Sequence, residues 1–393
     1  MKHIIRLIPI LMTLLLISAC KEGIESYDGL YIVGTQGKEV TATLTVDDVP
    51  SAIAVNVAAS EPTHSDVTID MKVEPQLVES FNKTHNKNYE LLPQAAYKLE
   101  NTTLHIASGS HVTETGLKLS IIDRDAMKFG TTYVLPVSID RVTGTSMPVI
   151  EASRTIYLVV NQVIITKAAN LEGGWRYYYA DFSNNSGKFD THAMKSVTFE
   201  ARVRFRQMNS SSTKWCYSVM GLEENLCLRT AGSAKTGWRL QLGDPNAMSS
   251  RDVLPNDKWV HLACVYNGET GKKYIYINGE LQGETTDSRH TISLANAYGQ
   301  DDLFYIGQSA ADDRLMEGWV CEARVWATAR TAAELKNNVC WVDPTSKDLV
   351  AYWQQQGNYW VVTDLTGNGY NAYYFSWGDN GVPSFVDGVR CPE

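Results

Sequence analysis

Alternating apolar and polar positions are clearest between Trp259 and Glu280, where the chain reads WVHLACVYNGETGKKYIYINGE. Two β-rich arms flank Asn267-Gly268, a turn dipeptide, and this pattern predicts a β-hairpin. We expect the hairpin to lie in the middle of a jelly-roll sheet and to align the strands on either side. Successive strand residues point to opposite faces. On the first arm, one face is expected to carry Val260, Leu262, Cys264 and Tyr266. On the second arm, one face is expected to carry Tyr274, Tyr276 and Asn278, and the other face Ile275 and Ile277.

The N-terminal half contains about seven short runs with a period of two, separated by turn residues, which is typical of an immunoglobulin-like sandwich. One stretch does not follow the period of two and predicts a helix. Leu77, Val78 and Phe81 have helical spacing, and Pro93 ends any helix by residue 92. The predicted strands are Val40–Val46, Ile53–Val57, Val67–Val73, Thr103–Ile106, Gly116–Ile122, Tyr133–Ile139 and Arg154–Val160.

The composition changes after Gln162–Leu171, since all ten tryptophans lie at Trp175 or beyond. A helix is predicted over Thr331–Val339, with Thr328 or Thr331 as its N-cap. Asp364–Gly369 reads DLTGNG, a turn. Besides the hairpin, the predicted strands are Val197–Phe205, Trp215–Leu222, Leu226–Arg229, Trp238–Leu242, Leu303–Ile306, Trp319–Trp326 and Val350–Trp353.

The first residues have the pattern of a targeting segment. Lys2 and Arg6 precede an apolar stretch, Leu7–Ile17, that is too short to span a membrane permanently. The small residues before Cys20 resemble a bacterial lipoprotein box, which implies cleavage at that point and lipidation of the Cys20 thiol. A plain secretory signal that leaves a free cysteine is the alternative.

A chain of 393 residues is expected to form two domains. Its net charge of -9 argues against a nucleic-acid partner, because phosphate binding needs an excess of Lys and Arg. We expect a signal peptide at 1–19, a tether at 20–30, an immunoglobulin-like domain at 31–165 and a jelly-roll domain at 166–393.

The six cysteines after Cys20 all lie in the C-terminal half, and export permits disulfides. Six cysteines allow fifteen connectivities, so the pairing stays open. Cys216 and Cys227 have the best geometric case, and six free buried thiols are the alternative. His261 and Cys264 would point to opposite strand faces, which argues against zinc. The six are Cys216, Cys227, Cys264, Cys321, Cys340 and Cys391.

Four pieces of the N-terminal half occur in a fixed order: FNKTHNKNYELLPQAAY, LHIASGSH, GTTYVLPVSI and TIYLVVN. Together they resemble the N-terminal domain of many Bacteroidetes surface lipoproteins, across roughly Tyr31 to Asn161. That family is immunoglobulin-like and has no assigned activity. The resemblance implies a spacer or platform between a lipid anchor and a C-terminal functional module.

The C-terminal half resembles the laminin-G/concanavalin A-like jelly roll, over about residues 168–390. The matching pieces include WVHLA, IYING, GWV, RVW and DLTGNG in this order. The chain departs at Trp353-Gln354-Gln355-Gln356, where relatives commonly carry Phe-x-Glu-Gly. The expected fold class is therefore all-β, an immunoglobulin-like sandwich followed by a laminin-G/concanavalin A-like jelly roll.

No acid pair of the kind a retaining glucanase uses is found on any predicted strand, because Glu-x-Asp-x-Glu and its close variants do not occur. Sugar binding needs only an aromatic platform and planar polar groups. Consecutive aromatics at Tyr177–Tyr179 and Tyr373–Phe375 cannot all point inward, so some rings should be exposed. The candidates are Trp175, Tyr178, Trp238, Trp360, Tyr374, Trp377 and Arg229.

Calcium is the one cofactor that the sequence suggests, since acidic loops flank Leu303–Gln308. Solvated loop acids are the alternative. The candidate ligands are Asp181, Asp301, Asp302, Asp312 and Asp313.

These observations favour a non-catalytic glycan-binding lipoprotein on the outer membrane, exposed at the cell surface and serving a polysaccharide-utilisation system. Its expected partners are a glycan, the membrane through its anchor, and proteins of an uptake complex. The substrate class comes from the resemblance alone. A structural or protein-binding lipoprotein is the first alternative, and a glycoside hydrolase on a concanavalin A-like fold is the second.

Overall fold

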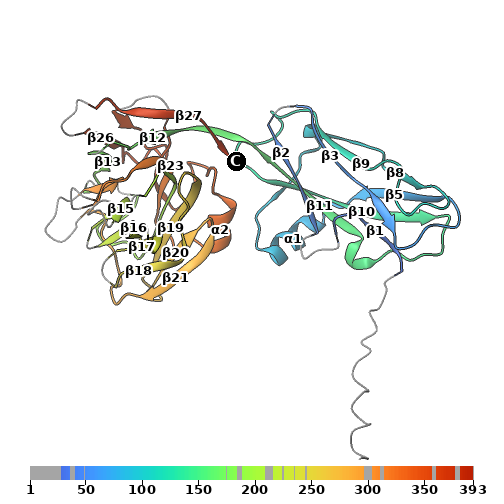
Figure 1. Cartoon of the computed structure of the whole chain (residues 1–393), viewed down its shortest axis with the longest axis horizontal. Coiled ribbons are helices and arrows are strands. Elements are labelled where there is room, and N and C mark those ends of the chain that lie inside the picture. The colour runs from blue at the N-terminus through green and yellow to red at the C-terminus, as the bar shows by residue number, and fades with distance from the viewer. Residues whose placement is uncertain are drawn as a thin grey trace, which may run out of the picture.

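The computed structural model describes residues 28–35, 40–47, 49–173, 175–183, 188–208, 216–223, 225–233, 235–243, 246–295, 303–309, 314–355, 360–376 and 381–392. These residues form two β-sandwiches joined by consecutive strands, β11 (Thr155–Gln162) and β12 (Ile164–Asn170) (Figure 1). The expected all-β class is confirmed. Within the described residues, no helix has the length and apolar character needed to cross a bilayer.

The N-terminal sandwich packs three sheets around one core. Ile69, Leu119 and Leu135 come from different strands and are all buried in that core. The largest sheet has the order β2 (Thr41–Val46), β11, β10 (Tyr133–Thr143), β5 (Val67–Val73), β8 (Thr103–Ile106), with β6 (Glu90–Leu91) beside β10. The smaller sheets are β3 (Ser51–Val55), β9 (Leu117–Ile121), β7 (Tyr97–Glu100), and β1 (Leu30–Ile32), β4 (Val57–Ala59).

Helix α1 (Leu77–His85) forms where the spacing predicts a helix, and it covers the outer face of the large N-terminal sheet. Phe81 packs against Val134 and Val159. Asn86 ends the helix in the left-handed conformation, φ 52°. Two short 3-10 turns, Gln94–Ala96 and Glu151–Ser153, complete this domain.

The C-terminal sandwich consists of two eight-stranded sheets. We call them the hairpin sheet and the aromatic sheet. The hairpin sheet has the order β21 (Glu280–Thr286), β20 (Lys272–Ile277), β19 (Trp259–Asn267), β14 (Ser196–Phe205), β23 (Gly318–Trp326), β12, β27 (Ser384–Cys391), with β24 (Leu349–Trp353) beside β23. The aromatic sheet has the order β18 (Met248–Val253), β17 (Gly237–Leu242), β16 (Leu226–Ser233), β15 (Cys216–Leu222), β22 (Phe304–Ile306), β13 (Arg176–Ala180), β26 (Ala372–Ser376), β25 (Val361–Val362).

The predicted hairpin forms between β19 and β20, with Cys264 opposite Ile275. Leu262 and Ile275 face the core between the sheets, as expected. Strands β21 and β14 flank the hairpin on either side, as expected, but only β21 lies beyond it on one side, so it lies nearer one edge of the sheet than its middle. The opposite face is covered by α2 (Ala332–Asn337), whose Leu335 packs against Ala263 and Val265.

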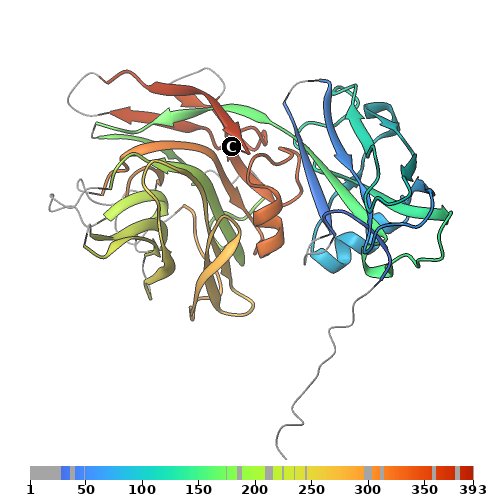
Figure 2. The same cartoon turned by 45° about the vertical axis from the view of Figure 1, so that its right-hand side comes forward.

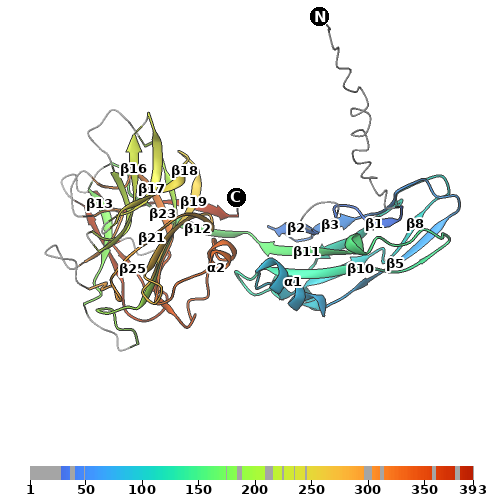
Figure 3. The ribbon, with the colours of Figure 1, turned by 90° about the horizontal axis from the view of Figure 1, so that it is seen from below.

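Helix α2 begins where the sequence predicts. Thr331 accepts the amide of Glu334, and the Glu334 carboxylate accepts the Thr331 amide, which together make a capping box. Figures 2 and 3 show α2 on the side of the C-terminal domain that faces the N-terminal domain, whereas β13 lies on the far side.

Direct contacts hold the two domains together. The rings of Phe129 and Trp341 meet edge to face at 5.4 Å. Lys87 donates to Asn337 Oδ1 at 3.4 Å. Arg390 donates to Asp47 at 2.5 Å. Aromatic, polar and ionic contacts therefore all cross this interface.

The cysteine pairing differs from the one that geometry favoured. Cys340 and Cys391 form a disulfide, whereas Cys216 and Cys227 are buried and are not cross-linked to each other. The reason is the register of β15 with β16, which places Cys216 opposite Ala231 and Cys227 opposite Gly221. The two thiols therefore lie toward opposite ends of that pair of strands.

Candidate functional site

Strands β13 and β26 divide their aromatic residues between two faces. Tyr178 and Tyr374 point into the core with Ala180 and Ala372. The alternate positions point away from the core, because strand side chains alternate. They carry Tyr177, Tyr179, Tyr373 and Phe375.

Strand register aligns the outward rings in rows across three strands. Tyr179 lies opposite Tyr373 on one side and Tyr305 of β22 on the other. Tyr177 lies opposite Phe375, and these rings stack with centroids 4.8 Å apart. Tyr305 meets the edge of Tyr177 at 5.6 Å, and Tyr179 lies 5.8 Å from Tyr373. We call Tyr177, Tyr179, Tyr305, Tyr373 and Phe375 the aromatic face.

The aromatic face is partly open to solvent. Tyr373 is 42% exposed, whereas Tyr177 is buried among its neighbours. Trp360 is 56% exposed, and its carbonyl oxygen accepts a hydrogen bond from the Tyr374 amide, so its backbone lies beside β26. A row of partly exposed tyrosines can stack on the apolar side of a sugar ring and donate hydrogen bonds from its hydroxyls.

The strand next to Tyr305 carries no side chain at the adjoining position. Gly221 of β15 lies opposite Tyr305. It has φ +127°, and a Cβ there would lie 2.3 Å from Leu226 O. Glycine is therefore required by close backbone approach, and β15 adds no side chain beside the Tyr305 ring.

Arg229 does not extend toward a ligand. It is 5% exposed, pairs with the Glu223 carboxylate, and donates to Gln241 Oε1 at 2.9 Å. Arg314 donates to the same Glu223 oxygen at 2.6 Å. Arg229, one of the candidates for glycan binding, is therefore part of a buried ion-pair cluster.

Three of the six predicted aromatic candidates also need correction. Tyr178 and Tyr374 are core residues, and burial raises the pKa of Tyr178 above its ordinary value. Trp238 is 3% exposed and donates its indole N–H to Met208 O at 3.0 Å. Trp175 is half-buried with φ 45° just before β13, and Trp377 lies outside the described residues. Among the described candidates, only Trp360 presents a largely exposed ring.

The calcium prediction stays a prediction, because four of its five candidate ligands lie outside the described residues. The Asp181 carboxylate accepts the Ser183 amide at 2.8 Å. No group of three or more His, Cys, Asp or Glu that could hold a metal is found among the described residues. Asp301, Asp302, Asp312 and Asp313 lie outside them.

Two buried acids on the outer side of the hairpin sheet are held by cations. Glu200 accepts from Arg330 and the Trp326 indole at 2.6 Å each. Burial pushes the pKa of Glu200 upward, but Arg330, Arg324 and His261 outweigh it and hold the pKa well below its ordinary value. Glu322 accepts from Arg324 at 2.6 Å and from Gln354 at 2.7 Å. A glycosidase acid needs a raised pKa, and Glu200 has the opposite.

Two family models match separate parts of the chain. Residues 25–146 match a family described as an N-terminal domain. Residues 175–336 match Laminin_G_3 of the concanavalin A-like lectin/glucanases superfamily. No curated protein matches the chain.

Solved structures extend the similarity across both domains. A proposed carbohydrate-binding protein of Bacteroides ovatus ATCC 8483 is 26% identical with a TM-score of 0.54, covering 91% of this chain and 97% of its own. A SAP-like pentraxin of Limulus polyphemus is 15% identical, with a TM-score of 0.38, over 57% of this chain and 95% of its own. EndoBT-3987 of Bacteroides thetaiotamicron is 18% identical, with a TM-score of 0.28, over 34% of this chain and 30% of its own.

Proposed function

We propose that this chain, which pairs an N-terminal domain of a recognised family with a concanavalin A-like domain, is a non-catalytic glycan-binding lipoprotein. The observation that carries the proposal is the aromatic face, three adjacent strands whose outward rings align in register. Similarity to a proposed carbohydrate-binding protein over 91% of this chain supports it.

We also propose membership of a polysaccharide-utilisation system, which the resemblance to Bacteroidetes surface lipoproteins suggests. The residues before Cys20 resemble a lipoprotein box, so we propose lipidation there and display on the outer surface of the outer membrane. The glycan would then be passed to partner proteins of an uptake complex. The aromatic face lies on the side of the C-terminal domain away from the N-terminal domain, which leaves it accessible to a polymer (Figure 1).

The buried acids of the C-terminal domain favour a non-catalytic protein. Glu200 and Glu322 are enclosed by arginine, tyrosine and tryptophan groups on the hairpin sheet. Glu223 is shared by two arginines on the aromatic sheet. Each of these carboxylates pairs with a guanidinium. This arrangement is typical of a structural ion pair and not of a carboxylate that transfers protons.

A glycan array with soluble protein starting at Lys21 tests the proposal. We expect saturable binding to one glycan class, and loss of that binding when Tyr179→Ala and Tyr373→Ala are combined. Both substitutions are on the solvent side of β13 and β26, so the far-UV circular dichroism should not change. The array is repeated with calcium and with chelator, which tests the acidic loops outside the described residues.

The outcomes separate the alternatives. Absence of binding to every glycan, together with capture of one partner protein, would overturn the proposal in favour of a protein-binding lipoprotein. Release of reducing ends from a bound polysaccharide would overturn its non-catalytic part. Binding that survives the double substitution would place the glycan site elsewhere on the chain.

A further inference from the structure

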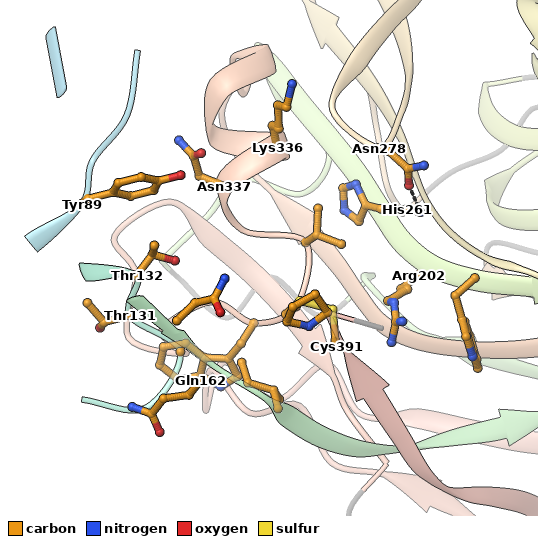
Figure 4. Close-up of a pocket in the computed structure, with 18 of the residues that line it drawn as sticks. Tyr89, Thr131, Thr132, Gln162, Arg202, His261, Asn278, Lys336, Asn337 and Cys391 are labelled. Carbon is orange, nitrogen blue, oxygen red and sulfur yellow. Dashed lines mark hydrogen bonds between the residues drawn. A yellow bond between two sulfur atoms is a disulfide. The ribbon is translucent and has the colours of Figure 1, made fainter. Parts of the chain in front are cut away.

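A cavity of about 470 Å³ lies between the two domains (Figure 4). The N-terminal domain supplies the segment after α1, the loop before β10 and the end of β11. The C-terminal domain supplies β14, β19, α2 and the Cys340–Cys391 disulfide. The volume is within the range of about 300–1,000 Å³ that small-molecule sites occupy, and neither domain encloses it alone.

Positive charge dominates the wall of this cavity. Lys87, Arg202 and Lys336 line it, whereas no Asp or Glu occurs among the described lining residues. Glu280 lies 2.6 Å from Lys336, but its side chain is 61% exposed and it is not part of the wall. A concave site whose wall carries only positive charge favours the binding of an anion.

The remaining wall residues suit a sugar. Side-chain amides at Asn161, Gln162, Asn278 and Asn337 are joined by the Thr131 and Thr132 hydroxyls. Amides and hydroxyls can both donate to and accept from sugar hydroxyls. Tyr89 and Trp341 supply apolar surface to the same wall.

Two buried acceptors of the wall lack hydrogen bonds among the described residues. They are Asn161 Oδ1 and His261 Nδ1, and the His261 side chain is 1% exposed. The other ring nitrogen, His261 Nε2, lies 3.0 Å from Glu200 Oε2. Buried polar atoms are rarely left without partners, so both atoms are suited to accept hydrogen bonds from a ligand.

We propose that this interdomain cavity binds one acidic sugar residue of the uronic acid type, with its carboxylate toward Lys87 and its hydroxyls toward the buried acceptors. The site is separate from the aromatic face, which belongs to the other sheet and lies on the far side of the domain. It makes the N-terminal domain part of a binding site rather than a spacer alone.

Isothermal titration of the two-domain protein with methyl β-D-glucuronide tests this proposal, with methyl β-D-glucoside as the neutral comparison and sodium sulfate as a bare anion. We expect the glucuronide to bind and the glucoside to bind at least tenfold more weakly. Lys87→Gln should weaken glucuronide binding about tenfold, since a charge-assisted contact is lost, and Lys87→Arg should retain most of it.

Two control variants localise the effect. Lys98→Gln removes an exposed lysine of the same domain that pairs with Glu100, and it should leave binding unchanged. Tyr373→Ala should also leave it unchanged, which distinguishes this site from the aromatic face. Absence of glucuronide binding, equal binding of the glucoside, or insensitivity to Lys87→Gln would overturn the proposal. Sulfate binding as tightly as glucuronide would show an anion site only and would equally overturn it.

Discussion

Gly130 of the N-terminal domain lies directly against the indole of Trp341 of the C-terminal domain. A Cβ added at position 130 would lie 2.0 Å from Trp341 Cε3. Gly130 also has φ +74°, a conformation that other residues rarely adopt. The approach of the two domains therefore depends on the absence of a side chain at this point.

Replacing Gly130 with alanine should loosen the interface. The added methyl group would force Trp341 away, and overpacking of this kind costs about 1–3 kcal/mol. Small-angle X-ray scattering should show a larger radius of gyration, and calorimetry should resolve two separate domain transitions. Gly109→Ala is the matched control, because Gly109 has φ +83° but no atom within 4 Å of its Cβ position. If both variants changed the radius of gyration and the domain transitions equally, backbone strain alone would explain the effect.

The aromatic face leads to a second prediction, which concerns a single ring. Tyr373→Ala should weaken binding of the glycan identified on the array by about 1–2 kcal/mol, or roughly five- to thirtyfold, since exposed aromatic anchors carry much of the energy at binding sites. Tyr373→Phe keeps the ring and should lose less. The dissociation constants are measured by calorimetry. A phenylalanine variant as weak as the alanine variant would show that the hydroxyl, and not stacking, dominates.

Local patterns predict the elements of this fold well. Val67–Val73 and Thr103–Ile106 are strands with the predicted bounds. The period-two spacing of Leu262 and Cys264 places both on one face of the strand, and that face packs on the core between the sheets. The position of the hairpin near a sheet edge could not be predicted in the same way, since it depends on pairings between segments far apart in the chain, such as β14 with β19 and with β23.

The candidate site was located by its aromatic runs but assigned to the wrong rings. Both runs contain three consecutive aromatics, and choosing between the two faces requires knowledge of which one meets the core. Ala180 and Ala372 share the inward face with Tyr178 and Tyr374. These small apolar residues are the only local indication of which face meets the core, and the indication is weak. Tyr305 joins the face solely through the pairing of β22 with β13, a contact between segments far apart in the chain.

The interdomain cavity has no counterpart in any local pattern. Lys87 and Lys336 belong to different domains and are separated by most of the chain. Their proximity follows from interface contacts such as Phe129 with Trp341. Such contacts join surfaces whose residues show no shared periodicity, so no sequence spacing reports them.

His261 leads to a prediction about pH. Burial lowers the pKa of His261 below its ordinary value of 6.5, although Glu200 acts in the opposite direction. The unfolded chain therefore binds a proton near pH 6.5 that the folded chain does not bind. The stability that His261 contributes is complete above pH 6.5 and decreases as the pH falls toward the lowered pKa. Urea unfolding between pH 7.5 and about 5 should show this loss.

The control for this prediction is another histidine. His261→Gln should flatten the dependence of the unfolding free energy on pH in this range, whatever its effect at pH 7.5. His111 is exposed on the N-terminal domain, so His111→Gln should keep the wild-type slope. Identical slopes for wild type and His261→Gln would show that the proton is taken up elsewhere.

The Cys340–Cys391 disulfide leads to the last prediction. It closes a loop with a sequence separation of 51 and joins the segment after α2 to the end of β27. Cross-linking a loop of this length restricts the unfolded chain, and its loss should destabilise the C-terminal domain by about 4 kcal/mol in the chain-entropy treatment. The measurement is urea unfolding of the double variant Cys340→Ser, Cys391→Ser.

Reductant should lower the stability of the wild type toward that of the variant and leave the variant unchanged. An equal loss in the variant under reductant would instead implicate another cross-link. Because Cys340 and Cys391 also line the interdomain cavity, the variant should bind methyl β-D-glucuronide more weakly even where it is fully folded.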